Sequence, residues 1–214
     1  MDTRNYQIVF LGPQGSGKGT QAEKLAVILN LPVIATGDMY RREAAKLTIL
    51  GEKISWYMHQ GKLVPDDITN ALITKRLGQP DCRRGFILDG YPRTIAQAQA
   101  LAEVTKLTHV MLIDISDAAA LVRIAGRVMC QCGATYHLKF NPPIERGVCD
   151  KCGQRLAVRK DDQQELALRQ RLKIYHQEID PIIARYEGAG ILHRINGERL
   201  IEDVHRDVLA LFSQ

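Results

Sequence analysis

The sequence predicts an α/β fold in which a doubly wound parallel sheet is covered by helices on both faces. The apolar run Tyr6–Leu11 has the composition of a buried parallel strand, and a glycine-rich loop follows it directly. Residues 20–29 then show helical spacing, and apolar runs continue to alternate with helical patterns along the chain. This alternation is typical of a parallel sheet with helices on each side.

The individual elements follow from the same patterns. We expect further strands at residues 33–35, 85–89, 108–115 and 190–195. Helical spacing predicts helices at residues 38–46, 52–60, 66–77, 94–105, 117–128 and 201–212. A long helix is expected over residues 161–187, bent near Pro181 because proline removes a backbone donor and clashes with the preceding turn.

Two stretches interrupt the alternation. Between Val33 and Gly85 the sequence has three helical patterns and no convincing strand, which predicts a helical insertion. From Arg127 to about Asp161 the helical period disappears, and this stretch contains four cysteines, the turn-like Asn141-Pro-Pro and a strand-like run at 135–138. We therefore expect a small β-rich excursion from the core.

Composition excludes several classes of protein. The 214 residues are 45% hydrophobic and 25% charged, as in globular proteins. The longest apolar runs are too short to cross a bilayer, and no signal-peptide pattern precedes the first strand, so we expect a cytoplasmic protein and no membrane partner. The net charge is +5 but aromatic residues are only 6%, which favours a small polyphosphate ligand over nucleic acid.

The loop between the first strand and helix has the composition of a phosphate cradle. Gly12-Pro-Gln-Gly-Ser-Gly-Lys18 fits the G-x-x-x-x-G-K spacing in the required strand-to-helix context. Glycines let backbone N–H groups approach phosphate oxygens, and the helix N-terminus adds its positive end. Lys18 supplies a mobile point charge. The general pattern has Ser or Thr directly after the lysine, whereas here Gly19 precedes Thr20.

Four separated motifs together resemble the adenylate kinase family. They are the Gly-Lys-Gly-Thr20 ending of the loop, Thr36-Gly-Asp-Met-Tyr-Arg41, Asp89-Gly-Tyr-Pro-Arg93-Thr and Arg159-Lys-Asp-Asp. The resemblance extends from about Gln7 to Val208 and implies the reaction Mg²⁺ATP + AMP ⇌ 2 ADP. It also implies a core of residues 1–35, 65–125 and 163–214, a flap over the nucleoside monophosphate at 36–64, and a lid at 126–162. The family default is a monomer.

The resemblance assigns roles to individual positions. It implies that the donor nucleotide contacts Gly15, Ser16, Gly17, Lys18, Gly19, Thr20, Arg123, Arg127 and Arg199. It implies that AMP contacts Thr36, Arg41, Val64, Gly90, Arg93, Gln97, Arg159 and Arg171. The charge of the transferred group would be met by Lys18, Arg93, Arg127, Arg159 and Arg171, with Asp89 orienting Mg²⁺. Positioning and charge neutralisation suffice for phosphoryl transfer, so no general base is expected.

The cysteines depart from the family pattern. The family's metal-binding lid carries two C-x-x-C pairs, but here Cys130-Gln-Cys132 is one residue short and Cys149-Asp-Lys-Cys152 is regular. Four thiolates in two pairs suit tetrahedral Zn²⁺ with a structural role. The alternatives are replacement of one ligand by His137 or Asp150, or a lid with free thiols. The separate Cys82 is expected to be a small buried apolar side chain.

A second departure lies in the long helix. One extra residue separates Arg159 from Arg171 relative to the family, and a single insertion would rotate a helical side chain by about 100°. We expect Arg171 to occupy the family's arginine position, because residues 172–181 return to the register of the family. Arg169 is the alternative.

Two other functions are compatible with the sequence. One is transfer to CMP, UMP or GMP, or from GTP, because Tyr40 stands where a smaller aliphatic residue is common and the base preference around Arg199 depends on backbone contacts. The other is a zinc-ribbon nucleic-acid-binding module on an inactive nucleotide-binding core.

Overall fold

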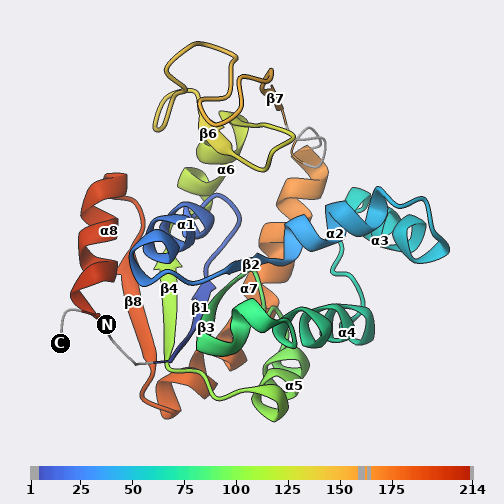
Figure 1. Ribbon diagram of the computed structural model, residues 1–214, viewed down its shortest axis with the longest axis vertical. Helices are drawn as coiled ribbons and strands as arrows, with labels where there is room; N and C mark the ends of the chain where they lie inside the picture. The colour runs from blue at the N-terminus through green and yellow to red at the C-terminus, as the bar shows by residue number, and fades with distance from the viewer. Residues whose placement is uncertain (1–4, 159–161, 163–164, 213–214) are drawn as a thin grey trace.

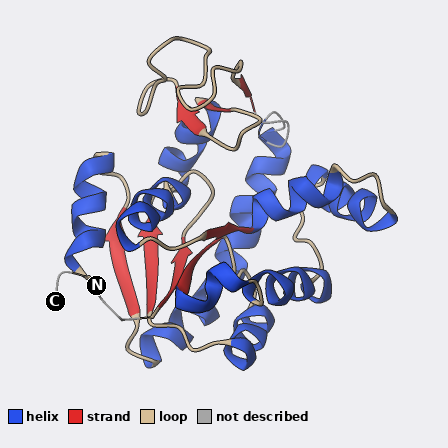
Figure 2. Ribbon diagram, in the orientation of Figure 1, coloured by secondary structure: helices blue, strands red, loops and turns tan. Residues whose placement is uncertain are grey.

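A five-stranded parallel sheet forms the centre of the protein. The computed structural model describes residues 5–158, 162 and 165–212. The strands are β1 (Tyr6–Leu11), β2 (Val33–Ala35), β3 (Gly85–Asp89), β4 (His109–Asp114) and β8 (Leu192–Asn196), in the spatial order β2-β3-β1-β4-β8 (Figures 1 and 2). Phe10 is paired with Asp89, and Ala35 with Asp89, so the carboxyl ends of the first three strands meet at one edge.

Helices cover both faces of this sheet, as the sequence predicts. On one face, α1 (Lys18–Leu29) and α8 (Ile201–Ala210) pack in a cluster that includes Ile8 and Phe10 of β1. On the other, α4 (Asp66–Leu77), α5 (Ile95–Val104) and α7 (Glu165–Gly188) contribute to a cluster with Val9 and Leu11. Because side chains alternate along a strand, β1 is buried on both sides, which explains its continuous apolar run.

The helical insertion is confirmed between β2 and β3. It consists of α2 (Thr36–Ala44), α3 (Ile49–His59) and α4, followed by the 3₁₀ helix η1 (Pro80–Arg84). Figure 1 shows α2 and α3 extending away from the sheet. A small apolar cluster around Tyr40, Ile54 and Val64 joins them to α4, which contributes Ile68 and Leu72.

The excursion after α6 (Asp117–Ala125) is a three-stranded antiparallel sheet. Its strands are β5 (Arg127–Met129), β6 (Thr135–His137) and β7 (Ala157–Val158), in the order β6-β5-β7. Val128, Tyr136, Cys130 and Cys149 form its buried core. The excursion that contains this small sheet, with its loops, is the uppermost part of the molecule in Figure 1.

The predicted helix over 117–128 is too long. The helix ends at Ala125, and residues 127–129 form β5 instead. Gly126 lies against His137, because a Cβ there would stand 2.5 Å from the imidazole Cε1. Pairing of β5 with β6 and β7 and the burial of Val128 outweigh the helical spacing that the sequence shows locally.

The remaining boundaries lie close to those expected. The bounds of β1, β2, β3 and α4 agree with prediction, while α1 and α2 begin two residues earlier. The described part of α7 starts at Glu165 and continues through Pro181 to Gly188. Among the described residues, no helix combines the length and apolar character needed to cross a membrane.

Candidate nucleotide site and cysteine cluster

The phosphate loop connects the end of β1 to the start of α1. Gly12, Gly15 and Gly17 have φ angles of 144°, 86° and 91°, which L side chains rarely adopt. A Cβ at Gly12 would lie 2.4 Å from the carbonyl oxygen of Ile113 on the neighbouring strand β4. The loop therefore depends on glycine both for its backbone conformation and for its close packing on the sheet.

Two polar side chains of the loop, Ser16 and Lys18, lie at the N-terminus of α1. Lys18 is its first residue, and its Nζ donates to the carbonyl oxygen of Pro13 at 3.2 Å. The buried Ser16 hydroxyl has no hydrogen-bond partner among the described residues. A buried hydroxyl, a lysine and the positive end of a helix together form an environment that stabilises phosphate oxygens.

Asp89 lies where the loop meets the neighbouring strand. It is the last residue of β3, and a Cβ at Gly19 would lie 3.1 Å from its Oδ2. Its Oδ1 is buried and has no hydrogen-bond partner within the described part of the chain. An unsatisfied buried carboxylate oxygen is costly, and carboxylates are suitable ligands for Mg²⁺ or its bound waters. The residues present therefore fit a divalent cation at this position.

The residue after Asp89 connects two side chains predicted to bind AMP. The carbonyl oxygen of Gly90 accepts from Thr36 Oγ1 at 2.9 Å and from Arg93 Nε at 2.7 Å. Gly90 has a φ of 74°, and a Cβ there would stand 2.9 Å from Arg93 Nη2. Thr36 is the first residue of α2 and is 1% exposed. Thr36, Gly90 and Arg93 are thus brought together by direct hydrogen bonds.

Arg41 and Val64 lie on the helical insertion. Arg41 pairs with Asp38 one turn earlier, and its buried Nη1 has no other partner among the described residues. Val64 is buried, and its carbonyl oxygen accepts from Thr69 Oγ1 at 3.3 Å. The Tyr40 hydroxyl lies 2.7 Å from the same Thr69 Oγ1. Tyr40 therefore packs in the core of the insertion and supports the backbone near Val64.

Gln97 is buried at the start of α5 with both ends of its amide engaged. Its Oε1 accepts from the backbone N–H of Arg93 at 2.7 Å. Its Nε2 donates to Asp66 Oδ1 at 2.7 Å. Asp66 stands outside the motifs that predicted the site, although an acidic residue in the first turn of a helix near a binding segment is a recognisable signal.

Two of the arginines predicted to meet the donor phosphates lie on α6 and at the start of β5. Arg123 on α6 donates from Nη1 to the Ser16 carbonyl oxygen at 3.3 Å, and burial lowers the pKa of its guanidinium. Arg127 donates from Nε and Nη2 to the two carboxylate oxygens of Asp162, both at 2.7 Å. Arg159 lies outside the described residues.

Arg171 reaches the phosphate loop despite the extra residue in the preceding segment. Its Nη1 donates to Gln14 Oε1 at 3.5 Å and its Nη2 to the carbonyl oxygen of Met58 at 2.8 Å. Gln14 also donates to Asp162 Oδ1 at 3.2 Å. Arg169, the alternative, is exposed. Gln14 and Asp162, which received no role from the sequence, thus connect the loop with two of the predicted arginines.

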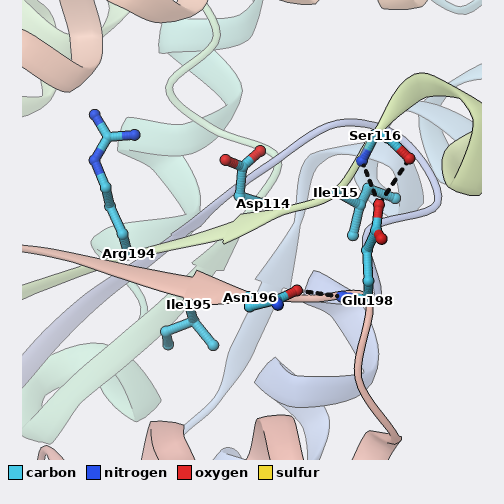
Figure 3. A pocket seen from close by; sticks show the side chains of 7 residues that line it. All are labelled: Asp114, Ile115, Ser116, Arg194, Ile195, Asn196 and Glu198. Carbon is cyan, nitrogen blue, oxygen red and sulfur yellow. Dashed lines mark hydrogen bonds between the residues drawn. The ribbon is translucent and has the colours of Figure 1, made fainter.

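Within the described residues, the hydrogen bond that the structure gives Arg199 is to α8 and not to the phosphate loop. Its Nη1 donates to Asp207 Oδ2 at 2.6 Å on α8. The preceding Glu198 accepts from the backbone N–H and hydroxyl of Ser116, at 2.9 and 2.7 Å. Figure 3 shows Glu198 directed at Ser116. An open pocket of about 500 Å³ lies beside it, at the carboxyl ends of β4 and β8. Its lining is Asp114, Ile115, Ser116, Arg194, Ile195, Asn196 and Glu198.

Four cysteines converge in the small antiparallel sheet region. The Sγ atoms of Cys130, Cys132, Cys149 and Cys152 all lie within 4.8 Å of one another. The closest pairs are Cys130 with Cys152 at 3.3 Å and Cys132 with Cys149 at 3.6 Å. Ligands about 2.3 Å from a tetrahedral Zn²⁺ would be roughly 3.8 Å apart, so the cluster fits a metal ion.

Cys132, the second cysteine of the shortened first pair, belongs to the cluster of four thiols. Among the described residues, the group of close ligand atoms consists of the four thiols and includes neither His137 nor Asp150. His137 Nδ1 accepts from the backbone N–H groups of residues 139 and 140, and Asp150 Oδ1 accepts from the N–H of Ile144. The fifth cysteine, Cys82, is buried in the apolar cluster under the sheet, as expected.

A glycine loop between the first strand and helix of a parallel sheet, with a carboxylate from the adjacent strand beside it, defines a P-loop nucleotide-binding protein. The adenylate kinase family model matches residues 10–191. The chain belongs to the adenylate kinase family and is a phosphotransferase. This membership does not favour the alternative acceptors or donor, or the nucleic-acid-binding module on an inactive core.

Several known adenylate kinases are similar to the chain over nearly its whole length. The chain is 46% identical to an adenylate kinase of Methanocella arvoryzae over 210 residues, covering 95% of this chain and 97% of the relative. It is 44% identical to an adenylate kinase of Symbiobacterium thermophilum over 207 residues, covering 94% and 95%. An adenylate kinase of Archaeoglobus fulgidus is 43% identical over 213 residues, covering 97% and 98%.

Proposed function

We propose that the chain transfers the γ-phosphoryl group of Mg²⁺ATP reversibly to AMP, forming two ADP, and that the named side chains perform this reaction. One observation carries the proposal. Asp89 faces Gly19 of the phosphate loop, and the next residue, Gly90, binds Thr36 and Arg93. The donor and acceptor subsites therefore adjoin across two consecutive residues, as transfer between two phosphates requires.

The donor phosphates would be held by the loop from Gly15 to Thr20. Its N–H groups and the N-terminus of α1 supply donors, and Lys18 supplies a charge that moves with the transferred group. Mg²⁺, when bound near Asp89, would neutralise part of the phosphate charge. Arg123 on α6 and Arg127 on β5, which are distant from the loop in sequence, would add fixed positive charge.

The acceptor would be held on the other side of Asp89. Arg41 and Arg93 carry planar guanidinium groups that suit bidentate binding of the AMP phosphate. Thr36, the backbone near Val64 and the amide of Gln97 would contact the nucleoside. Since the attacking phosphate oxygen is already ionised, the reaction needs orientation and charge neutralisation but no proton acceptor.

Segments 36–64 and 126–162 would act as mobile flaps that exclude water during transfer. Water would otherwise accept the phosphoryl group. Each segment reaches the core, as closure would require: Arg171 on α7 donates to the Met58 carbonyl oxygen, and Lys151 lies 3.7 Å from Glu23 of α1. We expect opening of these flaps to limit turnover. A chemical step as slow as steady-state turnover in rapid-quench kinetics would contradict this expectation.

The four thiols would bind one structural Zn²⁺. The small sheet has few buried apolar residues, so a metal ion would supply stability that its own core lacks.

The five cysteines form no disulfide bond in the described part of the chain, as is typical of a reducing compartment, and this favours the cytoplasm. The phosphate loop and acceptor arginines come from one chain, so a monomer would be sufficient for activity.

The test is phosphoryl transfer from Mg²⁺ATP to AMP, CMP, UMP, GMP and dTMP. We expect AMP to be the preferred acceptor. Lys18→Ala should lower kcat by on the order of 10²–10³, as loss of one transition-state donor does. Lys24→Ala is the matched control, because Lys24 lies on the same helix as Lys18 and pairs at the surface with Glu202 of α8. Transfer to another acceptor but not AMP would reject the base assignment, and no transfer at all would reject the reaction.

A further inference from the structure

Asp66 connects the two segments that flank the proposed acceptor base. It lies in the first turn of α4, two residues after Val64. Its Oδ1 accepts from Gln97 Nε2 at 2.7 Å, and its Oδ2 accepts from Thr94 Oγ1 at 2.8 Å. Thr94 is the N-cap of α5 and accepts from the Gln97 backbone N–H at 3.1 Å. Both oxygens of the carboxylate are therefore directed at the segment that carries Gln97.

These contacts allow only one orientation of the Gln97 amide. The Arg93 backbone N–H can only donate, and it meets Oε1. An ionised carboxylate can only accept, and that of Asp66 meets Nε2. Reversing the amide would place its NH₂ against an N–H and its oxygen against a carboxylate. Both ends oppose the reversal, and the site is buried, where such mismatches are most costly.

The orientation matters because a purine can present either sign of hydrogen bond at position 6. Each amide atom keeps one further hydrogen-bonding position, an N–H on Nε2 and a lone pair on Oε1. Adenine donates from its 6-amino group beside an acceptor nitrogen, which this amide edge complements. A 6-oxo purine accepts at position 6, so it would require the reversed amide.

We infer that Asp66 is a positioning residue that fixes the Gln97 amide and thereby sets the preference for 6-amino over 6-oxo purine monophosphates. This inference rests on the proposed function, since it requires the purine of the acceptor to meet Gln97. Asp66 itself acts only through Gln97.

The test compares AMP with IMP, which differs in replacing the 6-amino group by a 6-oxo group with a proton on N1. In the full chain with Mg²⁺ATP as donor, Asp66→Ala should lower the ratio of kcat/KM for AMP to that for IMP roughly tenfold, the effect of losing one charged hydrogen-bond partner. The KM for ATP should change less than about twofold, because the donor loop makes no contact in this network among the residues that the structure describes.

Asp67→Ala is the matched control, because Asp67 is an exposed carboxylate in the same helical turn. It should leave the ratio unchanged. If Asp66→Ala does not fold, Asp66→Asn makes the same comparison with a smaller expected fall, roughly threefold, because its amide can still accept from Gln97.

If Asp66→Ala lowers kcat/KM by the same factor with AMP and with IMP, Asp66 has only a structural role and the inference is overturned. A similar fall in the ratio for Asp67→Ala would overturn it too, since it would show a general charge effect. Failure of the wild-type chain to use AMP would instead reject the proposed function.

Discussion

Arg127 and Asp162 form a two-bond ion pair between the start of β5 and the segment before α7. Nε and Nη2 of the guanidinium donate to separate carboxylate oxygens, each at 2.7 Å. The side chains are 16% and 1% exposed. Gln14 of the phosphate loop also donates to Asp162. A residue proposed to meet the donor phosphates is thus held by a buried carboxylate that also contacts the loop.

Asp162→Asn should destabilise the protein by about 3 kcal/mol, because breaking a buried ion pair leaves a charge without its partner. Urea unfolding followed by circular dichroism measures this. Glu202→Gln removes a carboxylate from the exposed pair with Lys24 and should cost less than about 1 kcal/mol. Equal losses for both variants would show that the Arg127–Asp162 pair contributes no more than a surface pair.

Arg171, rather than Arg169, should carry the arginine function of α7. Arg171→Ala should lower kcat/KM by on the order of 10², while Arg169→Ala should change it less than about twofold. The reason is placement: Arg171 reaches Gln14 and Met58, whereas Arg169 is exposed. Steady-state kinetics with matched circular dichroism spectra would decide, and the opposite ranking would mean that the extra residue shifts the register.

The cysteine cluster should bind one Zn²⁺ per chain. Elemental analysis should give this ratio, and absorption spectra of the Co²⁺-substituted protein should indicate four sulfur ligands in a tetrahedron. Chelation should lower the melting temperature, because a metal at 100 times its Kd contributes about 2.7 kcal/mol.

Cys132→Ser should release the metal, since Cys132 belongs to the shortened pair and still lies 3.6 Å from Cys149. Asp150→Asn is the control, because its carboxylate accepts from the Ile144 N–H rather than facing the thiols. Retention of the metal by Cys132→Ser together with its loss in Asp150→Asn would assign the fourth ligand to Asp150.

Stability should fall in mild acid because of a histidine pair between β4 and β8. The rings of His109 and His193 are stacked with centroids 5.7 Å apart, and Phe212 and Tyr6 also contact His109. Burial, and then the neighbouring His193, lower the pKa of His109; burial also lowers the pKa of His193. Below the ordinary histidine pKa of about 6.5, the unfolded chain therefore binds more protons than the folded one.

The contribution of His109 to the free energy of unfolding is therefore complete above pH 6.5. It is lost as the pH falls through the lower pKa that His109 has in the folded protein. His109→Gln should reduce the pH dependence of unfolding free energy between pH 6.5 and 5 by up to about 1.4 kcal/mol per pH unit, the value for one proton. Urea unfolding across this range measures the slope. His59→Gln, on the exposed end of α3, is the comparison. An unchanged slope for His109→Gln would refute the prediction.

Local patterns predicted the elements well where the local and tertiary preferences agree. The run Tyr6–Leu11 is apolar throughout because both of its faces are covered, and α4 begins with two acidic residues that favour a helix N-terminus. The prediction failed at residues 126–128, where pairing with β6 and β7 replaced the last turn of a predicted helix. The residues next to this segment in the sequence do not indicate that β6 and β7 will pair with it.

The sequence by itself determined the phosphate loop and the identity of the family, because glycine spacing, Lys18 and the motifs around Thr36 and Asp89 are properties of consecutive residues. Only the tertiary structure decided which side chains act together. The amide of Gln97 is fixed by Asp66, 31 positions away. Arg171 meets the loop at Gln14, 157 positions away. Such contacts depend on where helices and strands pack, and hydrogen bonds between distant residues leave no periodic trace in the chain.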